Sequence, residues 1–471
     1  MMWIRPQRDS ERVSKMVILT ARAVCMSAFI CLGVAVLVAM TPRRALADAE
    51  QTGDPSSQLE LISRAENGDA SAQYELGRMY DSGEGLPQDS PSALHWLEGA
   101  AADNNHDAQA YLGALYAIGK GVEQDFPLAI HWFRKAAQEG QPTASYNLAL
   151  MHYRGTGVQK SLPTAFAWMR TAAEQGELDA VYAVGLMYVW GTGVAKSEFS
   201  GAAWLERAAA NGHQRAQYDL GVLYARGIGV EVDNNRAAQL FESAARQGLS
   251  EAQEQLGYLY ESGGGGELNL GAAAHWYRKA AEQGRADAQY RLATLYLLGK
   301  AGPPDYTEIL KWLLRAAEQG QADAIHNVGA MYRGGIGIAK DSAKAIEWFS
   351  QAAEAGLGDS ALVLGLMHYY GEGVTQDYAR AMNWLRDAAT MGSAAALTRI
   401  GLMYVHGQGV LCDTVTAYAW LSLALEAGDD TATEYHRSVD LRMTIDERRQ
   451  AVTVTDTLRA QILPKAVASR Y

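Results

Sequence analysis

Histidine is the residue type in this chain that most directly suggests metal binding or acid–base catalysis. His95, His131 and His275 each stand directly before a tryptophan, at equivalent positions of a repeat with a period of 36 residues. Zinc requires its ligands about 2 Å from one centre, whereas equivalent positions of stacked helix pairs lie roughly 10 Å apart. We therefore interpret these histidines as part of an exposed helix face and expect no metal site.

Three further features could support chemistry. His152 and His368 replace a tyrosine that the other repeats carry, and we expect them to be hydrogen-bonded core residues. Cys412 directly precedes Asp413, a predicted helix start, where a thiol pKa can be lowered; with no histidine or second thiol near it in sequence, we interpret it as structural. The glycine run 263–266 resembles a phosphate-binding loop, but no lysine follows it, so we interpret it as a loose turn.

Catalytic motifs with a defined mechanism are missing from the sequence. It contains no G-x-S-x-G nucleophile elbow, no H-E-x-x-H zinc motif, no phosphate-binding lysine loop and no dinucleotide fingerprint. We therefore expect no cofactor and assign no catalytic residue.

The elements that position these residues form a repeat of 36 residues, which runs from Ala72 to Gly428 without an insertion. Each unit begins with alanine (serine only at Ser360), has an aliphatic residue four positions later and tyrosine or histidine eight positions later. This spacing places the three residues on one face of a helix. A glycine then ends the helix in the left-handed conformation, and a second glycine, missing only at Ala301, keeps the turn tight.

A second helix follows each turn. Its start is marked in every unit by aspartate, asparagine or serine, whose side chains accept a hydrogen bond from a free N–H of the first turn. Seven residues later comes tryptophan (Leu240 in one unit), then an alanine pair (Ala424 and Leu425 in the last unit) and a closing glycine, which Asn104 replaces in the first unit. Such a helix pair buries its apolar face only by stacking on its neighbours, and we expect the tryptophan to fill the space between helices.

The two ends of the repeat array carry different signals. Residues 57–68 predict an unpaired helix that caps the first repeat, after a polar linker at 48–56. Residues 429–471 predict a helical cap on the last repeat, in which Thr444 and Glu447 form a capping box and Pro464 ends the final helix. The repeat array with its N-terminal cap thus spans 57–428.

Residues 1–47 predict an export signal. Five basic residues precede the uncharged run 23–40, and the small-x-small sequence that ends at Ala47 predicts cleavage after this residue. The run of 18 residues is also just long enough to span a bilayer, so an uncleaved inner-membrane anchor remains the alternative. In both cases the basic residues hold the N-terminus in the cytoplasm, and the body is periplasmic or secreted.

Charge and cysteine usage describe the exported body. Residues 1–47 hold seven of the 41 basic and two of the 53 acidic residues, so the remainder has a net charge of −17. A body of this charge is unsuited to binding nucleic acid. Only Cys412 remains after residue 47, so the mature chain forms no internal disulfide and packing alone must stabilise it.

The unit A-x-x-x-L-G-x-x-Y-x-x-G-x-G-V-x-x-D-x-x-x-A-x-x-W-x-x-x-A-A-x-x-G, legible in residues 108–140, resembles the Sel1-like repeat family, a relative of the tetratricopeptide repeat. The resemblance implies an all-α fold: a right-handed superhelical α-solenoid of about ten 36-residue helix–turn–helix repeats. It also implies a bacterial exported protein that binds other proteins. One branch of the family, which carries cysteine pairs in every repeat, is linked to β-lactam and cell-wall binding; this chain lacks those pairs.

Residues that vary between repeats are the candidates for recognition. Positions 3, 6 and 10 after the leading alanine form one stripe of the first helix, opposite its leucine–tyrosine face. First helices line the concave surface of such solenoids, and mixed aromatic, arginine and aliphatic side chains suit a protein or peptide ligand. In the alternative interpretation, the aliphatic members pack against neighbouring first helices and the others are merely solvated. The partner-binding candidates, called here the first-helix stripe, are Tyr111, Arg154, Trp190, Arg226, Tyr258, Arg291, Tyr370, Arg399 and His406.

These observations favour a non-catalytic scaffold or adaptor of the bacterial cell envelope, in envelope or exopolysaccharide assembly or in signalling regulation. Two alternatives remain open: a secreted factor that binds host proteins, and an enzyme or wall-ligand binder that acts on peptidoglycan or β-lactams. Trp190 is the strongest single candidate, because it is the only tryptophan after residue 47 outside the packing position.

Overall fold

The computed structural model describes residues 55–264, 268–300 and 302–468, and this part of the chain contains 23 α-helices and no strand. The predicted all-α architecture is confirmed. The predictions for the export signal (1–47) and for the linker up to residue 54 lie outside the described residues. Within the described ranges, no helix combines the length and apolar composition that a bilayer crossing requires.

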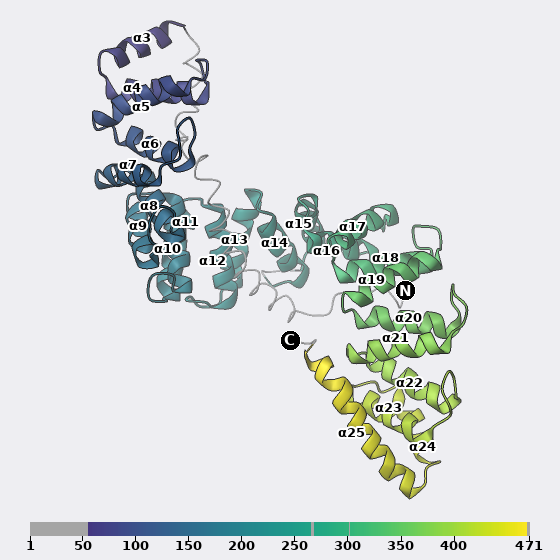
Figure 1. Cartoon of the computed structure of the whole chain (residues 1–471). Helices are drawn as coiled ribbons and strands as arrows, with labels where there is room; N and C mark the ends of the chain where they lie inside the picture. The colour runs from purple at the N-terminus through teal and green to yellow at the C-terminus, as the bar shows by residue number, and fades with distance from the viewer. Residues whose placement is uncertain (1–54, 265–267, 301, 469–471) are drawn as a thin grey trace. The chain divides into compact units, whose positions relative to one another are not determined.

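The described chain divides into two compact units, one up to Ala252 and one from Gln253 onward. We call them the N-terminal and C-terminal units, and each is described by itself. Figure 1 shows their helices stacked in successive pairs. The N-terminal unit contains α3 (Pro55–Glu66), α4 (Ala70–Ser82), α5 (Ser90–Ala102), α6 (His106–Ile118), α7 (Phe126–Gln138), α8 (Pro142–Arg154), α9 (Leu162–Glu174), α10 (Leu178–Trp190), α11 (Glu198–Ala210), α12 (Gln214–Arg226) and α13 (Asn234–Arg246).

The boundary between the units falls inside α14 (Ser250–Ser262). The C-terminal unit continues with α15 (Leu270–Glu282), α16 (Ala286–Leu297), α17 (Tyr306–Glu318), α18 (Ala322–Gly334), α19 (Ser342–Glu354), α20 (Gly358–Tyr370), α21 (Tyr378–Thr390), α22 (Ala394–His406), α23 (Thr414–Glu426), α24 (Ala432–Asp440) and α25 (Ile445–Ala468).

Each repeat consists of an even-numbered first helix and an odd-numbered second helix, from α4 and α5 to α22 and α23. A first helix packs on the second helix of its own repeat and on that of the repeat before it, as α8 does on α9 and α7. The leading alanine and the following leucine of the first helix, such as Ala144 and Leu148, are buried at these contacts. The 36-residue spacing therefore builds a hydrophobic core that is continuous from repeat to repeat within a unit.

The structure corrects the expectation that the tryptophan of each second helix fills the space between helices. Of the nine tryptophans at this position, seven are only half-buried, whereas Trp312 and Trp420 are buried. The space between the helices is filled instead by the next residue, for example Phe133, which is 1% exposed. Phe133 faces Gly113 so closely that a Cβ there would lie 2.7 Å from the Phe133 Cδ1 atom. The residue after the tryptophan points at the small residue of the first helix, and the indole ring is displaced to the rim of the core.

The turn between the two helices has a second function. The first glycine ends the helix in the left-handed conformation as predicted, with φ 71° at Gly191. The second glycine, Gly193, also has positive φ, but it lies against the start of α9 in the preceding repeat. A Cβ on Gly193 would stand 2.2 Å from the carbonyl oxygen of Leu162. This glycine is therefore required for the contact between repeats as well as for the turn.

Second-helix caps are confirmed in nine of the ten repeats. Asp125, for instance, accepts a hydrogen bond of 2.9 Å from the backbone N–H of Leu128. Asp89 is the exception, since its carboxylate accepts from the hydroxyl of Ser92 and makes no capping bond.

We expect Asp125→Ala to lower the free energy of unfolding by about 1 kcal/mol, the usual contribution of a capping side chain. Asp89→Ala is the matched control, because both residues precede a helix of the N-terminal unit with proline at its second position. Its expected cost is at most about 0.5 kcal/mol. Urea denaturation followed by circular dichroism measures both values, and equal losses would contradict this assignment of the caps.

The C-terminal end of the described chain is covered by two helices. The capping box is confirmed: the Thr444 N–H donates to the Glu447 carboxylate over 2.7 Å, and the Glu447 N–H donates to the Thr444 hydroxyl over 3.3 Å. α25 packs on α23 and α21, with Ala451 in their core. Pro464 does not end α25, which continues to Ala468. A proline removes one backbone hydrogen bond from a helix, and the remaining bonds carry α25 past it.

Candidate functional site

Position 3 of the first-helix stripe contributes to contacts between repeats. The Tyr111 hydroxyl donates to the carboxylate of Asp81 in the preceding first helix over 2.5 Å, and the Lys120 ammonium lies 2.8 Å from the same carboxylate. Asp81 is only 2% exposed. Burial, followed by the bond to this carboxylate, raises the pKa of Tyr111 well above its usual value. Tyr111 is therefore engaged within the fold.

The same position is engaged in the C-terminal unit. Arg291 forms an ion pair of 2.9 Å with Glu261 of the preceding repeat, and its guanidinium lies 5.1 Å from the ring centre of Tyr258. Arg399 lies 5.2 Å from the ring centre of Tyr369 and 5.8 Å from that of Tyr370. Position-3 residues thus pack against the preceding first helix, and Tyr258 at position 6 contacts Arg291 of the following one. Neither interpretation of the sequence expected this, because the alternative assigned packing only to the aliphatic members of the stripe.

Position 10 of the stripe behaves differently, because it is the last residue of every first helix except α16, which ends one residue earlier. Trp190 is 44% exposed and Tyr370 is 59% exposed. Arg154 and His406 are exposed, and Arg226 is half-buried. Arg154, Trp190 and Arg226 lie in the N-terminal unit, whereas Tyr370 and His406 lie in the C-terminal unit. The structure thus separates the nine candidates into a packed set and a surface set.

A polar cluster between α10 and α12 was not predicted. The Tyr182 hydroxyl donates to the Asp219 carboxylate over 2.7 Å, and the Tyr182 ring stacks on His213 with 4.5 Å between ring centres. Arg215 pairs with Glu251 over 3.0 Å beside them. Although Asp219 is partly exposed, the surrounding protein desolvates its carboxylate and raises its pKa to about 6. The hydrogen bond from Tyr182 lowers this pKa, but its effect is smaller than that of desolvation.

This pKa predicts a pH dependence of stability. The folded state binds a proton at Asp219 more tightly than the unfolded state, so the free energy of unfolding should fall as pH rises from about 4 to about 6. The shift corresponds to at most about 3 kcal/mol, which solvent screening reduces. In Asp219→Asn this contribution should vanish. As pH rises across the window, the free energy of unfolding of the unchanged chain should therefore fall relative to that of the variant. Urea titrations at several pH values measure it, and a constant difference would contradict the assignment.

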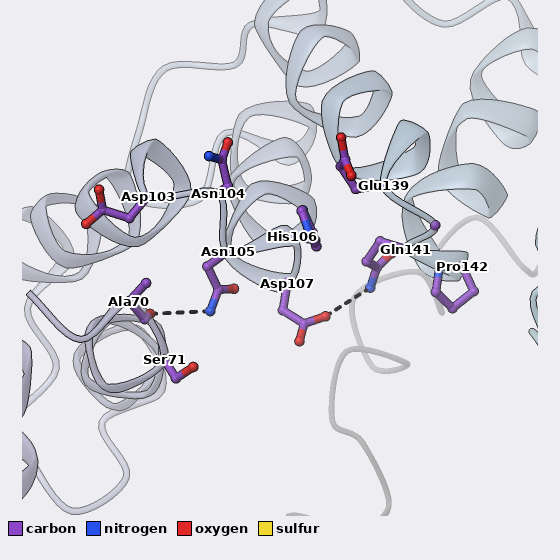
Figure 2. Close-up of a pocket in the computed structure, with 11 residues that line it drawn as sticks. Ala70, Ser71, Asp103, Asn104, Asn105, His106, Asp107, Glu139, Gln141 and Pro142 are labelled. Atoms are coloured by element: carbon purple, nitrogen blue, oxygen red, sulfur yellow. Dashed lines mark hydrogen bonds between the residues drawn. The ribbon is translucent and has the colours of Figure 1, made fainter.

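One hollow of about 510 Å³ lies at the starts of α4, α6 and α8. Figure 2 shows its polar lining, which links successive first helices. The Asn105 amide donates to the Ala70 carbonyl over 3.3 Å, and the Gln141 amide donates to Asp107 over 3.4 Å. Asn105 and Gln141 also cap their own helices. These side chains are already occupied in joining repeats, and the arrangement resembles no catalytic constellation.

The three histidines that precede a tryptophan are exposed, as the sequence predicted. His95, His131 and His275 are exposed and pack edge-on against the neighbouring tryptophans. No group of three or more histidine, cysteine or acidic residues suited to hold a metal ion occurs among the residues that the structure describes.

Two expectations about isolated residues were wrong. His368 is buried, which lowers its pKa, but its Nδ1 atom has no hydrogen-bond partner within the described chain. The Nδ1 atom of His152 likewise has none. His368 is thus a buried ring and His152 a half-buried one, each at a position that carries tyrosine in the other repeats. Cys412 is exposed, so it fills no core position and has no structural role as a buried thiol.

Hydrogen bonds of glutamine also join the repeats. The Gln217 amide donates to the Ala209 carbonyl over 3.2 Å, while its oxygen accepts from the Gln247 amide over 2.7 Å. The equivalent Gln289 repeats this pattern with Ala281 and Gln319. The recurrence of glutamine directly after the leading alanine was a signal that could have revealed these bonds.

Comparisons with known proteins agree with this architecture. A family model described as "Sel1 repeat" matches ten times, at residues 70–105, 106–141, 142–177, 178–213, 214–249, 250–284, 286–321, 322–357, 358–393 and 394–429. A search of the curated proteins gave no match.

Two solved structures are similar over most of the chain. One is a protective antigen present in uropathogenic Escherichia coli strains, described as displaying an SLR fold; it is 33% identical with a TM-score of 0.76, over 91% of this chain and 96% of the antigen. The other is a Sel1 repeat protein from Oxalobacter formigenes, 32% identical with a TM-score of 0.51, over 68% of this chain and 93% of that protein.

Proposed function

Because this chain belongs to the Sel1 repeat family, we propose that it is an exported, non-catalytic scaffold of the bacterial cell envelope that holds a partner protein against its first helices. Sel1 repeat proteins are generally scaffolds for protein–protein interaction and are generally non-enzymatic. The envelope location and the binding face are the parts that we add.

The exposure of position 10 carries the proposal. Trp190 and Tyr370 are large aromatic side chains that end first helices and remain about half exposed, although the fold buries residues as large as Phe133 and Tyr277. Tryptophan and tyrosine on a rigid helix are typical centres of protein interfaces, because they bury much apolar surface at a small loss of conformational entropy. We therefore place the partner on the position-10 residues of the first helices.

Three observations support export. The sequence of residues 1–47 has the order of an export signal, and only Cys412 lies after it, which suits an oxidising compartment without internal disulfides. The E. coli relative is described as a protective antigen, which fits a body that lies outside the cytoplasm. That description also favours the second candidate, a secreted factor that binds host proteins.

Affinity capture from envelope extracts tests the binding face. We expect the triple variant Trp190→Ala, Arg226→Ala, Tyr370→Ala to retain at least about tenfold less partner than the unchanged chain, since truncation of interface aromatics typically costs about 2 kcal/mol or more each. Phe199→Ala is the control, because Phe199 is 76% exposed on the second helix α11. Equal recovery by the triple variant and the control would overturn this placement.

Fractionation of cells that produce the full chain tests the location. The proposal expects the protein in the periplasmic or inner-membrane fraction, with about five kilodaltons removed if cleavage follows Ala47, as expected from 47 residues of about 110 Da each. Recovery mainly from the culture medium would favour the secreted factor instead.

A further inference from the structure

The last turns of α8, α10 and α12 differ in charge from the rest of this acidic chain. The segments 147–160, 183–196 and 220–230 contain no aspartate or glutamate, although the whole chain has a net charge of −12. They contain four basic residues, Arg154, Lys160, Lys196 and Arg226, and the exposed Trp190. Three successive first helices of one unit thus present a locally basic and aromatic edge.

These helices belong to one packed group. Leu150 of α8, Leu186 of α10 and Leu223 of α12 are all buried in the same hydrophobic cluster. Arg154, Trp190 and Arg226 each end their helix at equivalent positions. Equivalent positions of successive helix pairs lie roughly 10 Å apart in a stack of this kind, so we expect the three side chains in a row of roughly 20 Å, with the aromatic ring between the two cations.

Arg226 is a cation without a counter-charge in the fold. It is half-buried, forms no ion pair with any described residue, and burial lowers its pKa. By contrast, the basic residues at position 3 and in the neighbouring turns are engaged: Lys196, for instance, pairs with Glu198 over 2.7 Å. A carboxylate supplied by a ligand would restore the charge compensation that Arg226 lacks.

We propose that the row Arg154, Trp190 and Arg226 binds an extended acidic segment of the partner protein, in which an apolar residue lies between two carboxylates. This inference rests on the proposed function and specifies the chemistry of its partner. An extended chain in the polyproline II conformation advances about 3.1 Å per residue with three residues per turn, so side chains at i, i+3 and i+6 lie on one face at a spacing of about 10 Å. The expected pattern is therefore acidic-x-x-apolar-x-x-acidic, with the apolar side chain on Trp190.

Fluorescence anisotropy with labelled peptides tests the inference on the purified exported chain. The probe is Gly-Gly-Glu-Ser-Ser-Phe-Ser-Ser-Glu-Gly-Gly, and the comparison peptides replace both glutamates by lysine or the phenylalanine by serine. We expect the acidic probe to bind about tenfold or more tightly than either comparison peptide, and binding to weaken with added salt. Trp190→Ala should reduce affinity for the probe about tenfold.

Charge reversal gives the decisive comparison. The double variant Arg154→Glu, Arg226→Glu should prefer the lysine peptide over the glutamate peptide. Its matched control is Arg170→Glu, Arg246→Glu, which changes the net charge equally at exposed positions of second helices in the same unit. Circular dichroism confirms that each variant is folded. The inference is overturned if the unchanged chain does not prefer the acidic probe, or if the control variant reverses the preference as strongly. It is also overturned if the row binds polygalacturonate, a polysaccharide that carries carboxylates, and does not bind the peptide.

The two proposals fail in distinguishable ways. If the charge-reversed variant captures the same envelope proteins as the unchanged chain, while the Trp190, Arg226, Tyr370 variant does not, the acidic-segment inference fails and the scaffold stands. If no captured protein depends on either set of residues, the scaffold proposal fails. The peptide titration then decides the chemistry of the row by itself.

Discussion

Replacement of Phe133 by alanine is expected to lower the free energy of unfolding by about 3–5 kcal/mol. Phe133 is 1% exposed and fills the space against Gly113 between α6 and α7. Its removal leaves a cavity that this close-packed stack of 13-residue helices relaxes into only partly. Because each repeat is stabilised mainly by its neighbours, the loss should also weaken the contacts of α6 and α7 with the adjoining repeats.

Phe199 provides the control for this prediction. It lies in the same unit but is 76% exposed, so Phe199→Ala should change stability by at most about 0.5 kcal/mol. Guanidinium denaturation followed by tryptophan fluorescence measures both variants. Similar losses in the two would show that the residue after the tryptophan does not hold the helix pair together.

The second large effect is expected at Gly193. Gly193→Ala places a Cβ 2.2 Å from the backbone oxygen of Leu162, at a residue whose φ is 74°. The left-handed conformation alone costs a side-chain-bearing residue about 1–2 kcal/mol. Since backbone atoms cannot move aside as a flexible side chain does, the repeats must also separate, and we expect a total loss of about 3 kcal/mol or more.

Gly212 separates the two causes. Its φ is 83°, but a Cβ there would have no heavy atom within 4 Å. Gly212→Ala should therefore cost only the conformational strain of about 1–2 kcal/mol. Thermal and urea denaturation of both variants measure the difference. If the alanine variants at 193 and 212 are equally stable, the close approach between repeats has no energetic role.

The sequence predicted the repeating elements well, because their signals are local. The glycine that ends each first helix and the side chain that caps each second helix act within a few residues of themselves. The ends of the first helices, the starts of the second helices and the capping box at Thr444 followed from such signals, whereas the end predicted at Pro464 did not.

Contacts between repeats were predicted less well, because their partners lie 30 to 39 residues apart. The ion pair of Arg333 with Glu372 gives no signal in either local sequence. Likewise, Ser360 is an irregular residue in the alanine position, and the structure explains it by a 2.8 Å hydrogen bond to His326 of the preceding repeat. The residue after the tryptophan escaped notice because its identity varies between leucine, phenylalanine, methionine and tyrosine, although its packing role is constant.

The candidate site could be predicted only to the level of a helix face. Positions 3 and 10 share one stripe of their own helix, so the sequence could not distinguish Arg291 from Trp190. The neighbouring first helix makes the distinction, since it lies against position 3 and leaves position 10 at the surface. The exposure of a stripe residue therefore depends on how the neighbouring repeat packs, which the sequence of one repeat does not reveal.

The central claim is that the regular residues of each repeat are consumed by packing, while irregular residues at the ends of first helices bind the partner. Site-specific photo-cross-linking in living cells tests it most directly, with a benzophenone amino acid placed at Trp190 or at Phe199, two exposed aromatic positions of one unit. The account predicts a discrete cross-linked protein adduct from position 190 and none from position 199. An adduct from 199 with none from 190 would contradict it.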